Sequence, residues 1–254
     1  MSNIIQRTLF AAGNVFLKSA WNNDILELFK CFESELFKKA SRFFASLSVR
    51  IMNKKIILVV LLVILIPTIT QLFTLMASNK TEKQPYTVVK KEKDFEIRFY
   101  PAATLATVMT TASTYKDVAS PGFRKLAGYI FGGNQDGMSI AMTAPVHMDI
   151  SETGSTMSFV MPDGMTPENL PKPNDPSVHI STTKPEYVAA IQFGGYASDK
   201  DIQKYAARLE QALQERGIKH SGHFRFLGYN APYQFLCRRN EVIVTVEYEV
   251  IGDK

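Results

Sequence analysis

The side chains best suited to metal binding or nucleophilic chemistry are few in this chain, which has four histidines and two cysteines. His220 and His223 are three residues apart, but two imidazoles without a third patterned ligand do not form a structural metal site. Cys237 could supply a thiolate, although a lone cysteine more often packs as a small apolar side chain. His147 follows a proline-containing turn and is the main candidate for a metal ligand. We therefore expect ligation by this one histidine at most.

Residue groupings that would indicate catalysis do not stand out in the sequence. Gly132-Gly133 and Gly194-Gly195 lack the Lys-Ser/Thr pair of a phosphate loop. Glu247 and Glu249 alternate along one strand segment, which is typical of a solvent-facing side. No serine or cysteine lies in a recognisable nucleophile elbow. We therefore expect a binding protein rather than an enzyme.

One apolar segment, Ile56–Ala77, contains no ionisable residue in its 22 positions. As a helix it would extend roughly 33 Å, enough to cross a hydrocarbon core of about 30 Å. Pro67 lies inside it, and a membrane helix can tolerate proline as a kink. A buried core helix is the alternative, but it would carry a polar stripe, and this segment has none. The sequence predicts a transmembrane signal anchor over residues 52–77, with residues 56–77 in the lipid bilayer.

The charges that flank this segment predict its direction. Arg50, Lys54 and Lys55 precede it with no acid nearby, whereas the two lysines after it enclose Glu82. Positively charged flanks tend to stay in the cytoplasm. We expect a single-pass membrane protein whose C-terminal domain is extracytoplasmic (periplasmic in a bacterium), joined to the anchor by a polar linker over residues 78–85.

The first 51 residues have two interpretations. Met52 opens the stretch MNKKIILVVLL, which has every part of a signal-anchor start, so residues 1–51 could come from an upstream start assignment. Alternatively, apolar residues recur at helical spacing from Ile25 to Leu47 among basic residues, which is typical of an amphipathic helix on an anionic membrane surface. Native peptides that begin upstream of Met52 would exclude the first interpretation.

Composition is consistent with one domain over residues 86–254. The net charge of +5 is shared between the membrane flanks and this domain, which is too diffuse to indicate a nucleic-acid partner. Cys31 and Cys237 lie on opposite sides of the predicted span and cannot pair. The domain therefore depends on its apolar core rather than on an internal disulfide.

The spacing of apolar residues predicts the elements that would position these side chains. The first set contains strands at Tyr86–Val88, Phe95–Phe99 and Ala102–Thr111, a helix at Pro121–Phe131, and strands at Met138–Ile150 and Thr156–Met161. The second contains strands at Val178–Thr182 and Tyr187–Gly194, a helix at Asp199–Arg216 capped by Ser198, and strands at Phe224–Tyr229 and Glu241–Ile251. Two strand-strand-helix-strand-strand repeats predict an α+β fold, in which antiparallel halves close into a distorted β-barrel with two helices.

Several motifs occur in a distinctive order: Glu96–Tyr100, Phe123–Ile130 with Gly132–Asn134, Ile140–Val146, Phe159–Pro162, Tyr229–Pro232 and Arg238–Val242. Together they resemble the SOUL heme-binding protein family, over roughly Tyr86 to Val250. The resemblance implies two helices on a distorted nine-stranded barrel, related to the effector-binding domains of some bacterial regulators. It also implies binding of heme or another tetrapyrrole.

The resemblance places the ligand in a shallow apolar cleft between the first helix and the loop before the last strand, here Pro121–Phe131 and Ala231–Asn240. A porphyrin needs a broad apolar slot, and its propionates need cations at the rim. The expected cofactor-binding residues are Phe123, Arg124, Lys125, Ala127, Ile130, Tyr233, Phe235 and Arg238. Alternatively, the apolar helix residues are plain core and the arginines are solvated at a strand end.

The early-loop histidine that ligates iron in some family members has no counterpart before His147. We therefore expect non-covalent binding through the faces of the macrocycle, with His147 as the one candidate axial ligand. The predicted function is a membrane-anchored carrier or buffer of heme or another tetrapyrrole. Two alternatives are a non-heme module of the regulator type that binds an amphipathic or cationic molecule, and a tetrapyrrole-modifying enzyme.

Overall fold

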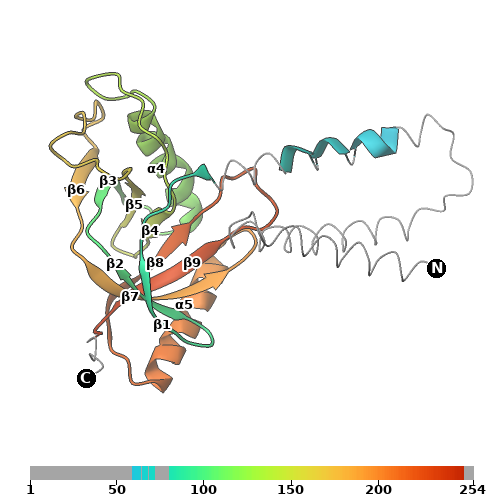
Figure 1. Ribbon diagram of the computed structural model, residues 1–254, viewed down its shortest axis with the longest axis vertical. Coiled ribbons are helices and arrows are strands. Elements are labelled where there is room, and N and C mark those ends of the chain that lie inside the picture. Colours follow the sequence, from blue (N-terminus) through green and yellow to red (C-terminus); the bar gives the residue numbers. More distant parts are fainter. Residues whose placement is uncertain (1–58, 64, 68, 72–79, 249–254) are drawn as a thin grey trace, which may run out of the picture. The chain divides into compact units, whose positions relative to one another are not determined.

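The computed structural model describes residues 59–63, 65–67, 69–71 and 80–248. They belong to two compact units, a smaller one formed by Met1–Asn79 with Gln234–Cys237, and a larger one formed by Lys80–Tyr233 with Arg238–Lys254. The expectations for residues 1–51, and for the last strand beyond position 248, lie outside the described residues. Figure 1 shows the larger unit as a twisted sheet with two helices packed on it.

The larger unit contains nine strands and two helices among its described residues (Figure 1). The strands are β1 (Thr87–Lys91), β2 (Glu96–Tyr100), β3 (Thr104–Thr110), β4 (Val146–Asp149), β5 (Ser155–Val160), β6 (Val178–Thr182), β7 (Glu186–Phe193), β8 (His220–Gly228) and β9 (Asn240–Val246). The helices are α4 (Tyr115–Ile130) and α5 (Asp199–Glu215). The predicted repeat is confirmed, because β2-β3-α4-β4-β5 is followed by β6-β7-α5-β8-β9, with β1 added in front.

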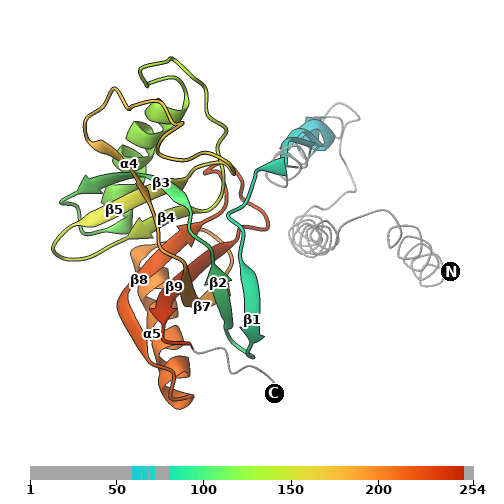
Figure 2. The same ribbon diagram turned by 60° about the vertical axis from the view of Figure 1, so that its left-hand side comes forward.

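The nine strands form one antiparallel sheet in the order β1-β2-β7-β9-β8-β4-β5-β3-β6. Among the strands described, no hydrogen-bonded pairing joins β1 to β6, so the sheet is open and the predicted closed barrel is wrong. Closure requires a consistent stagger and tilt around the whole ring. Figure 1 shows the two end strands, β1 and β6, well apart, and Figure 2 shows from a second side how the sheet twists.

Each helix covers its own part of the sheet. Helix α4 packs against β3, β5 and β6, and α5 packs against β7, β8 and β9. Helix α5 begins as predicted at the N-cap Ser198, whose hydroxyl accepts a hydrogen bond from the amide of Asp201 at 3.2 Å. Its buried side is formed by Leu209, Ala212 and Leu213.

Helix α4 begins six residues before the predicted start at Pro121. The preference of proline for the first helical turn favours a start there, but Pro121 lies inside the helix. The true N-cap is Thr114, whose hydroxyl accepts from the amide of Asp117 at 3.2 Å. This earlier start brings Tyr115 and Val118 into the helix.

The predicted strand at Met138–Ile150 is shorter in the structure, where β4 covers only Val146–Asp149. The residues before it form isolated bridges, including one between Ser139 and Phe131. Pro145 has no backbone N–H to give to a ladder, so regular pairing begins only after it.

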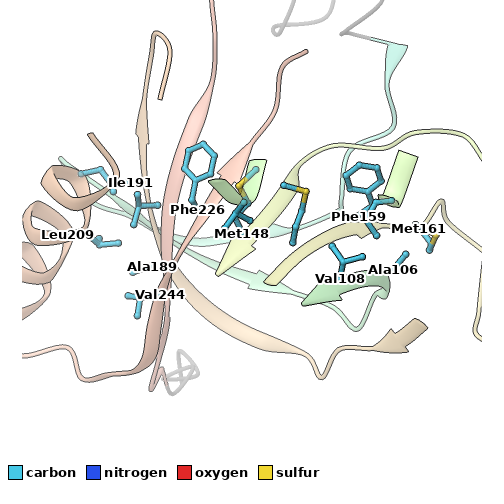
Figure 3. Close-up of a cluster of buried hydrophobic side chains, with 14 of the residues drawn as sticks. Ala106, Val108, Met148, Phe159, Met161, Ala189, Ile191, Leu209, Phe226 and Val244 are labelled. Carbon is cyan, nitrogen blue, oxygen red and sulfur yellow. The ribbon is translucent and has the colours of Figure 1, made fainter. Parts of the chain in front are cut away.

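The main core fills the space between the sheet and the helices (Figure 3). Figure 3 shows Val108 of β3 and Phe159 of β5 in one part of this core, and Ile191 of β7 and Leu209 of α5 in another. A smaller buried group lies on the opposite face of the strands and contains Tyr100, Val188, Ala190, Leu227 and Ile243. The inner strands are therefore covered on both faces.

In the smaller unit, residues 59–63, 65–67 and 69–71 are helical. Their large apolar side chains are mostly exposed, Val63 by 64% and Ile66 by 59%. Within the ranges that the structure describes, no helix has both the length and the apolar character needed to span a bilayer. The other residues of the predicted span, Ile56–Ala77, lie outside those ranges.

Candidate functional site

Helix α4 carries an apolar stripe along one side. Phe123, Ala127 and Phe131 are four residues apart, so they follow one another along the helix. Phe123 and Ala127 are half-buried, whereas Phe131 at the C-cap is 66% exposed. The Phe123 ring packs edge-on against Phe159, with ring centroids 5.2 Å apart. This α4 stripe (Phe123, Ala127 and Phe131) offers a surface that a flat apolar molecule could cover.

The remaining predicted residues of α4 differ in their surroundings. Arg124 is exposed, and at about 100° per residue it lies beside the stripe. Lys125 lies farther round the helix and donates from Nζ to Ser177 Oγ at 3.0 Å. Ile130 is 1% exposed and packs in the core. Of the two predicted cations of α4, Arg124 is therefore the one better placed to meet a ligand on the stripe.

The connection between β8 and β9, residues 229–239, is held partly by Arg238. Its Nη1 donates to the Ala231 carbonyl at 2.7 Å, and its guanidinium carbon lies 4.5 Å from the centroid of the Tyr196 ring. Tyr233 is 69% exposed. Of the residues predicted to bind a ligand here, Tyr233 is thus open to solvent, whereas Arg238 braces the connection itself.

Phe235 is the remaining predicted residue of the connection. It belongs to the smaller unit, where its backbone N–H donates to Gln71 Oε1 at 3.2 Å. Phe235 and α4 belong to different units, so a contact between Phe235 and a ligand on α4 stays a prediction.

The first turn of α4 lies within electrostatic range of the connection. Burial raises the pKa of Tyr115, and the positive charge of Arg238 opposes that rise. The Tyr115 amide donates to Asp199 Oδ1 at 2.6 Å, and its ring packs edge-on against Phe226 at 5.2 Å. The charge of Arg238 therefore acts on the first turn of α4.

His147 on β4 is half-buried, with its Nε2 atom 2.7 Å from Gln84 Oε1. Because an amide oxygen only accepts hydrogen bonds, Nε2 carries the proton and donates it. Burial lowers the pKa of His147 to about 3, so the ring is neutral. Iron ligation through Nε2 would require loss of this hydrogen bond. In the described part of the chain, no three His, Cys, Asp or Glu side chains gather as a metal site.

A buried charged cluster, which the sequence analysis missed, joins the connection to the sheet. Glu241 on β9 is fully buried. It accepts hydrogen bonds from Arg98 at 2.8 and 3.1 Å, from Arg239 at 3.0 and 2.7 Å, and from the Tyr229 hydroxyl at 2.9 Å. The Arg98 guanidinium carbon also lies 4.3 Å from the ring centroid of Tyr86, whose hydroxyl oxygen accepts from Arg239 at 3.0 Å. We call these five residues the Glu241 cluster.

The three charged members of the Glu241 cluster, Glu241, Arg98 and Arg239, keep one another ionised. Burial favours the neutral acid, but the hydrogen bonds from Arg98 and the charges of Arg239 and Arg98 outweigh it and lower the pKa of Glu241. Burial also opposes the charge of both guanidiniums, yet Glu241 raises the pKa of Arg98 and Arg239. Removing one partner from a buried ion pair costs about 3–5 kcal/mol. A cationic ligand would have to displace these arginines, so the carboxylate is not available to it.

The sequence signal for this cluster lies in β2. Alternation of Phe95, Ile97 and Phe99 predicts that Arg98 faces solvent, but Arg98 is 2% exposed. In the sequence, two features indicate that the face of β2 that carries Arg98 is also covered. One is the position of Arg98 in the middle of a short aromatic strand, and the other is Glu241 within the Arg238–Val242 motif.

The larger unit contains at least two cavities. The smaller, of about 190 Å³, is lined by residues such as Ser113, Asp199 and Phe226, and it falls below the usual size of ligand pockets, about 300–1,000 Å³. The larger, of about 430 Å³, has Glu82, Asp163 and Glu168 in its lining and neither lysine nor arginine. That charge disfavours an anionic ligand, and the α4 stripe lines neither cavity.

Comparison with known proteins gives consistent matches for the larger unit. A family model described as SOUL heme-binding protein matches residues 81–245. Heme-binding protein 2 of Mus musculus is 30% identical over 168 residues, which cover 63% of this chain and 82% of that protein. Heme-binding protein 1 of Sus scrofa is 30% identical over 160 residues, which cover 60% and 84%. A solved structure described as a hydrolase from Listeria innocua matches with a TM-score of 0.46 and 11% identity, over 63% of this chain and 94% of that one.

Proposed function

This chain belongs to the SOUL heme-binding protein family, and from that premise we propose that its larger unit binds heme or another tetrapyrrole non-covalently. The main support is the extent of the family match, because residues 81–245 include nearly all of that unit's described residues. The relatives described above are heme-binding proteins by name. The proposed role is to carry or buffer the ligand rather than to transform it.

The proposed site is the side of α4 that carries the α4 stripe. Phe123, Ala127 and Phe131 would cover one face of the macrocycle, and Arg124 beside them would pair with a propionate in a charge-assisted hydrogen bond. Tyr233 on the connection would contribute to the opposite wall. The residues fit such a group, because α4 combines an accessible apolar surface with an adjacent cation.

We propose that the macrocycle is held mainly through its faces. When bound, heme supplies a redox-active iron, but the protein groups near α4 only bind and orient the ring. His147 is engaged with Gln84 at 2.7 Å. A strong axial bond is therefore not part of the proposed site.

A heme titration of the full-length chain in detergent tests this function. We expect a Soret shift that saturates at one heme per chain. Iron-free protoporphyrin should bind with similar affinity, because the faces rather than the iron provide the contacts. Binding of heme alone would show that iron is ligated. No Soret shift at micromolar heme would reject the proposal and favour the non-heme binding module, and turnover with a reductant would favour an enzyme.

We further propose that Ile56–Ala77 anchors the chain in a bilayer, with the larger unit outside the cytoplasm. This proposal is supported by the lack of ionisable residues in the segment and by the exposed apolar side chains of its helical part, such as Val63 and Ile66. Removing such surface from water gains about 25 cal/mol per Å². Of the predicted linker, Glu82 and Gln84 are hydrogen-bonded to Ala144 of the larger unit, so only residues 78–81 would serve as a short tether.

A further inference from the structure

The connection between β8 and β9 is irregular but closed at its base. The Tyr229 N–H donates to the Arg239 carbonyl at 3.3 Å, and the Arg239 N–H donates to Asn230 Oδ1 at 2.6 Å. The side chain of Asn240 donates to the Gly195 carbonyl at 2.8 Å. These bonds hold the two ends of the connection against each other and against the neighbouring loop.

The Glu241 cluster ties this base to a more distant strand. The Arg239 guanidinium carbon lies 4.2 Å from the ring centroid of Tyr229, and both side chains donate to the Glu241 carboxylate. Arg98 donates to the same carboxylate from β2, which is separated from β9 by β7 in the sheet. One buried acid therefore fixes both ends of the connection relative to a strand two places away.

We propose that Glu241 is a positioning residue for ligand binding: it sets the shape of the connection that forms one wall of the tetrapyrrole site, without touching the ligand. This inference rests on the proposed function. Glu241 is fully buried, so its effect on a ligand must pass through Arg239 and Tyr229. Without the charge of Glu241, Arg98 keeps only Glu96 as a carboxylate partner, whereas Arg239 loses its ion pair. Turning Arg239 toward water would then open the base of the connection.

Glu241→Gln in the full-length chain tests this role, with Glu186→Gln as a matched control. Glu186 on β7 also holds an arginine with two hydrogen bonds, from Arg225 at 2.9 and 2.8 Å, and accepts from Thr245. Both substitutions remove a paired carboxylate from the sheet. Only Glu241 is bonded to the connection.

We expect heme to dissociate from Glu241→Gln roughly tenfold faster or more, the factor that corresponds to losing one charged hydrogen bond. Amide exchange at Tyr229 and Arg239 should also accelerate, and the Soret band of the bound form should broaden. Glu186→Gln should retain the wild-type dissociation rate and exchange. All measurements are made at a temperature where circular dichroism shows every variant to be folded.

Wild-type heme dissociation from folded Glu241→Gln would overturn the proposal, and so would an equal change in Glu186→Gln, since general destabilisation would then explain both. If Glu241→Gln does not fold, Asn230→Ala takes its place, because it removes only the acceptor of the Arg239 amide. It should change dissociation in the same direction by a smaller factor, and no change would overturn the role. A wild-type chain that binds no heme would instead reject the proposed function itself.

Discussion

At the scale of single residues, His147 makes the stability of the larger unit depend on pH. Its pKa is about 3 in the folded chain and about 6.5 in an unfolded one. As pH falls below about 6.5, the unfolded state therefore takes up a proton first, and stability drops by up to about 1.4 kcal/mol per pH unit until the folded pKa is reached.

We expect His147→Gln, which keeps a donor for Gln84, to lose less stability than the wild type between about pH 7 and pH 5. Urea unfolding followed by circular dichroism measures this difference. Other titrating groups, Glu241 among them, act equally in both proteins, so the comparison isolates the imidazole. An identical pH dependence in the two proteins would contradict the assignment of a buried neutral ring.

Arg124 is the residue whose charge matters most in the proposed site. Arg124→Glu should weaken heme affinity by about tenfold or more, because it replaces a charge-assisted pair with a repulsion. Lys204→Glu on α5 makes a similar charge change at another exposed helix position and should leave affinity unchanged. Soret titrations of both variants measure the effect, and equal affinities would remove Arg124 from the site.

The adjacent residues Arg238 and Arg239 illustrate what residue type alone does not predict. Arg238 was predicted to be a rim cation, yet it braces the connection through Ala231, and its neighbour Arg239 is bound to Glu241 and Tyr86. These roles depend on partners far away in the chain. Local spacing cannot encode them.

At the scale of elements, the end of α4 depends on a close backbone approach at Gly133. A Cβ atom there would lie 2.5 Å from the carbonyl oxygen of Gly128, which accepts the Gly133 N–H at 2.8 Å. We expect Gly133→Ala to destabilise the unit by about 1–3 kcal/mol. Gly128→Ala meets nothing within 4 Å and should be neutral or stabilising by up to about 1 kcal/mol, because alanine favours the helix. Thermal unfolding of both variants tests the pair, and equal melting temperatures would argue against the close contact.

The two helices differ in how well the sequence predicts them. Helix α5 has a serine cap, a continuous apolar stripe and a glycine after its end, so its start at Asp199 was predicted correctly. Helix α4 contains Pro121, a residue typical of the first helical turn, so the start was predicted there rather than at the weaker capping pattern of Thr114. The predicted strand at Met138–Ile150 was too long for a related reason. Its residues before Pro145 include no glycine, asparagine or aspartate that would indicate a turn, so the sequence does not show that their backbone lacks regular strand partners.

At the scale of the whole molecule, the proposed anchor predicts where the chain is found. The full-length protein should sediment with membranes and resist alkaline carbonate extraction. A chain without residues 1–77 should be released into the soluble fraction and still bind one heme. Full-length protein in the soluble fraction would contradict the anchor without affecting the heme-binding proposal.

The duplicated order of elements was predictable from apolar periodicity, whereas closure of the sheet was not. Periodicity reports which side of a strand is buried, and in β2 both Ile97 and Arg98 are buried. Whether the two end strands of the sheet, β1 and β6, pair with each other depends on the register and twist of all nine strands together. No short segment of the sequence determines the register and twist of the whole sheet.

Among the described strands, β1 lies at one end of the sheet, and its outer edge bears on how a second strand could pair with it. A free strand edge is a template on which a second copy can add its own edge. Here Lys90 and Lys91 are exposed and pair with Glu92 and Glu96, and an irregularity between Val88 and Lys90 interrupts the regular pairing of the strand. Charged side chains and a broken outline at this edge oppose the addition of a second strand.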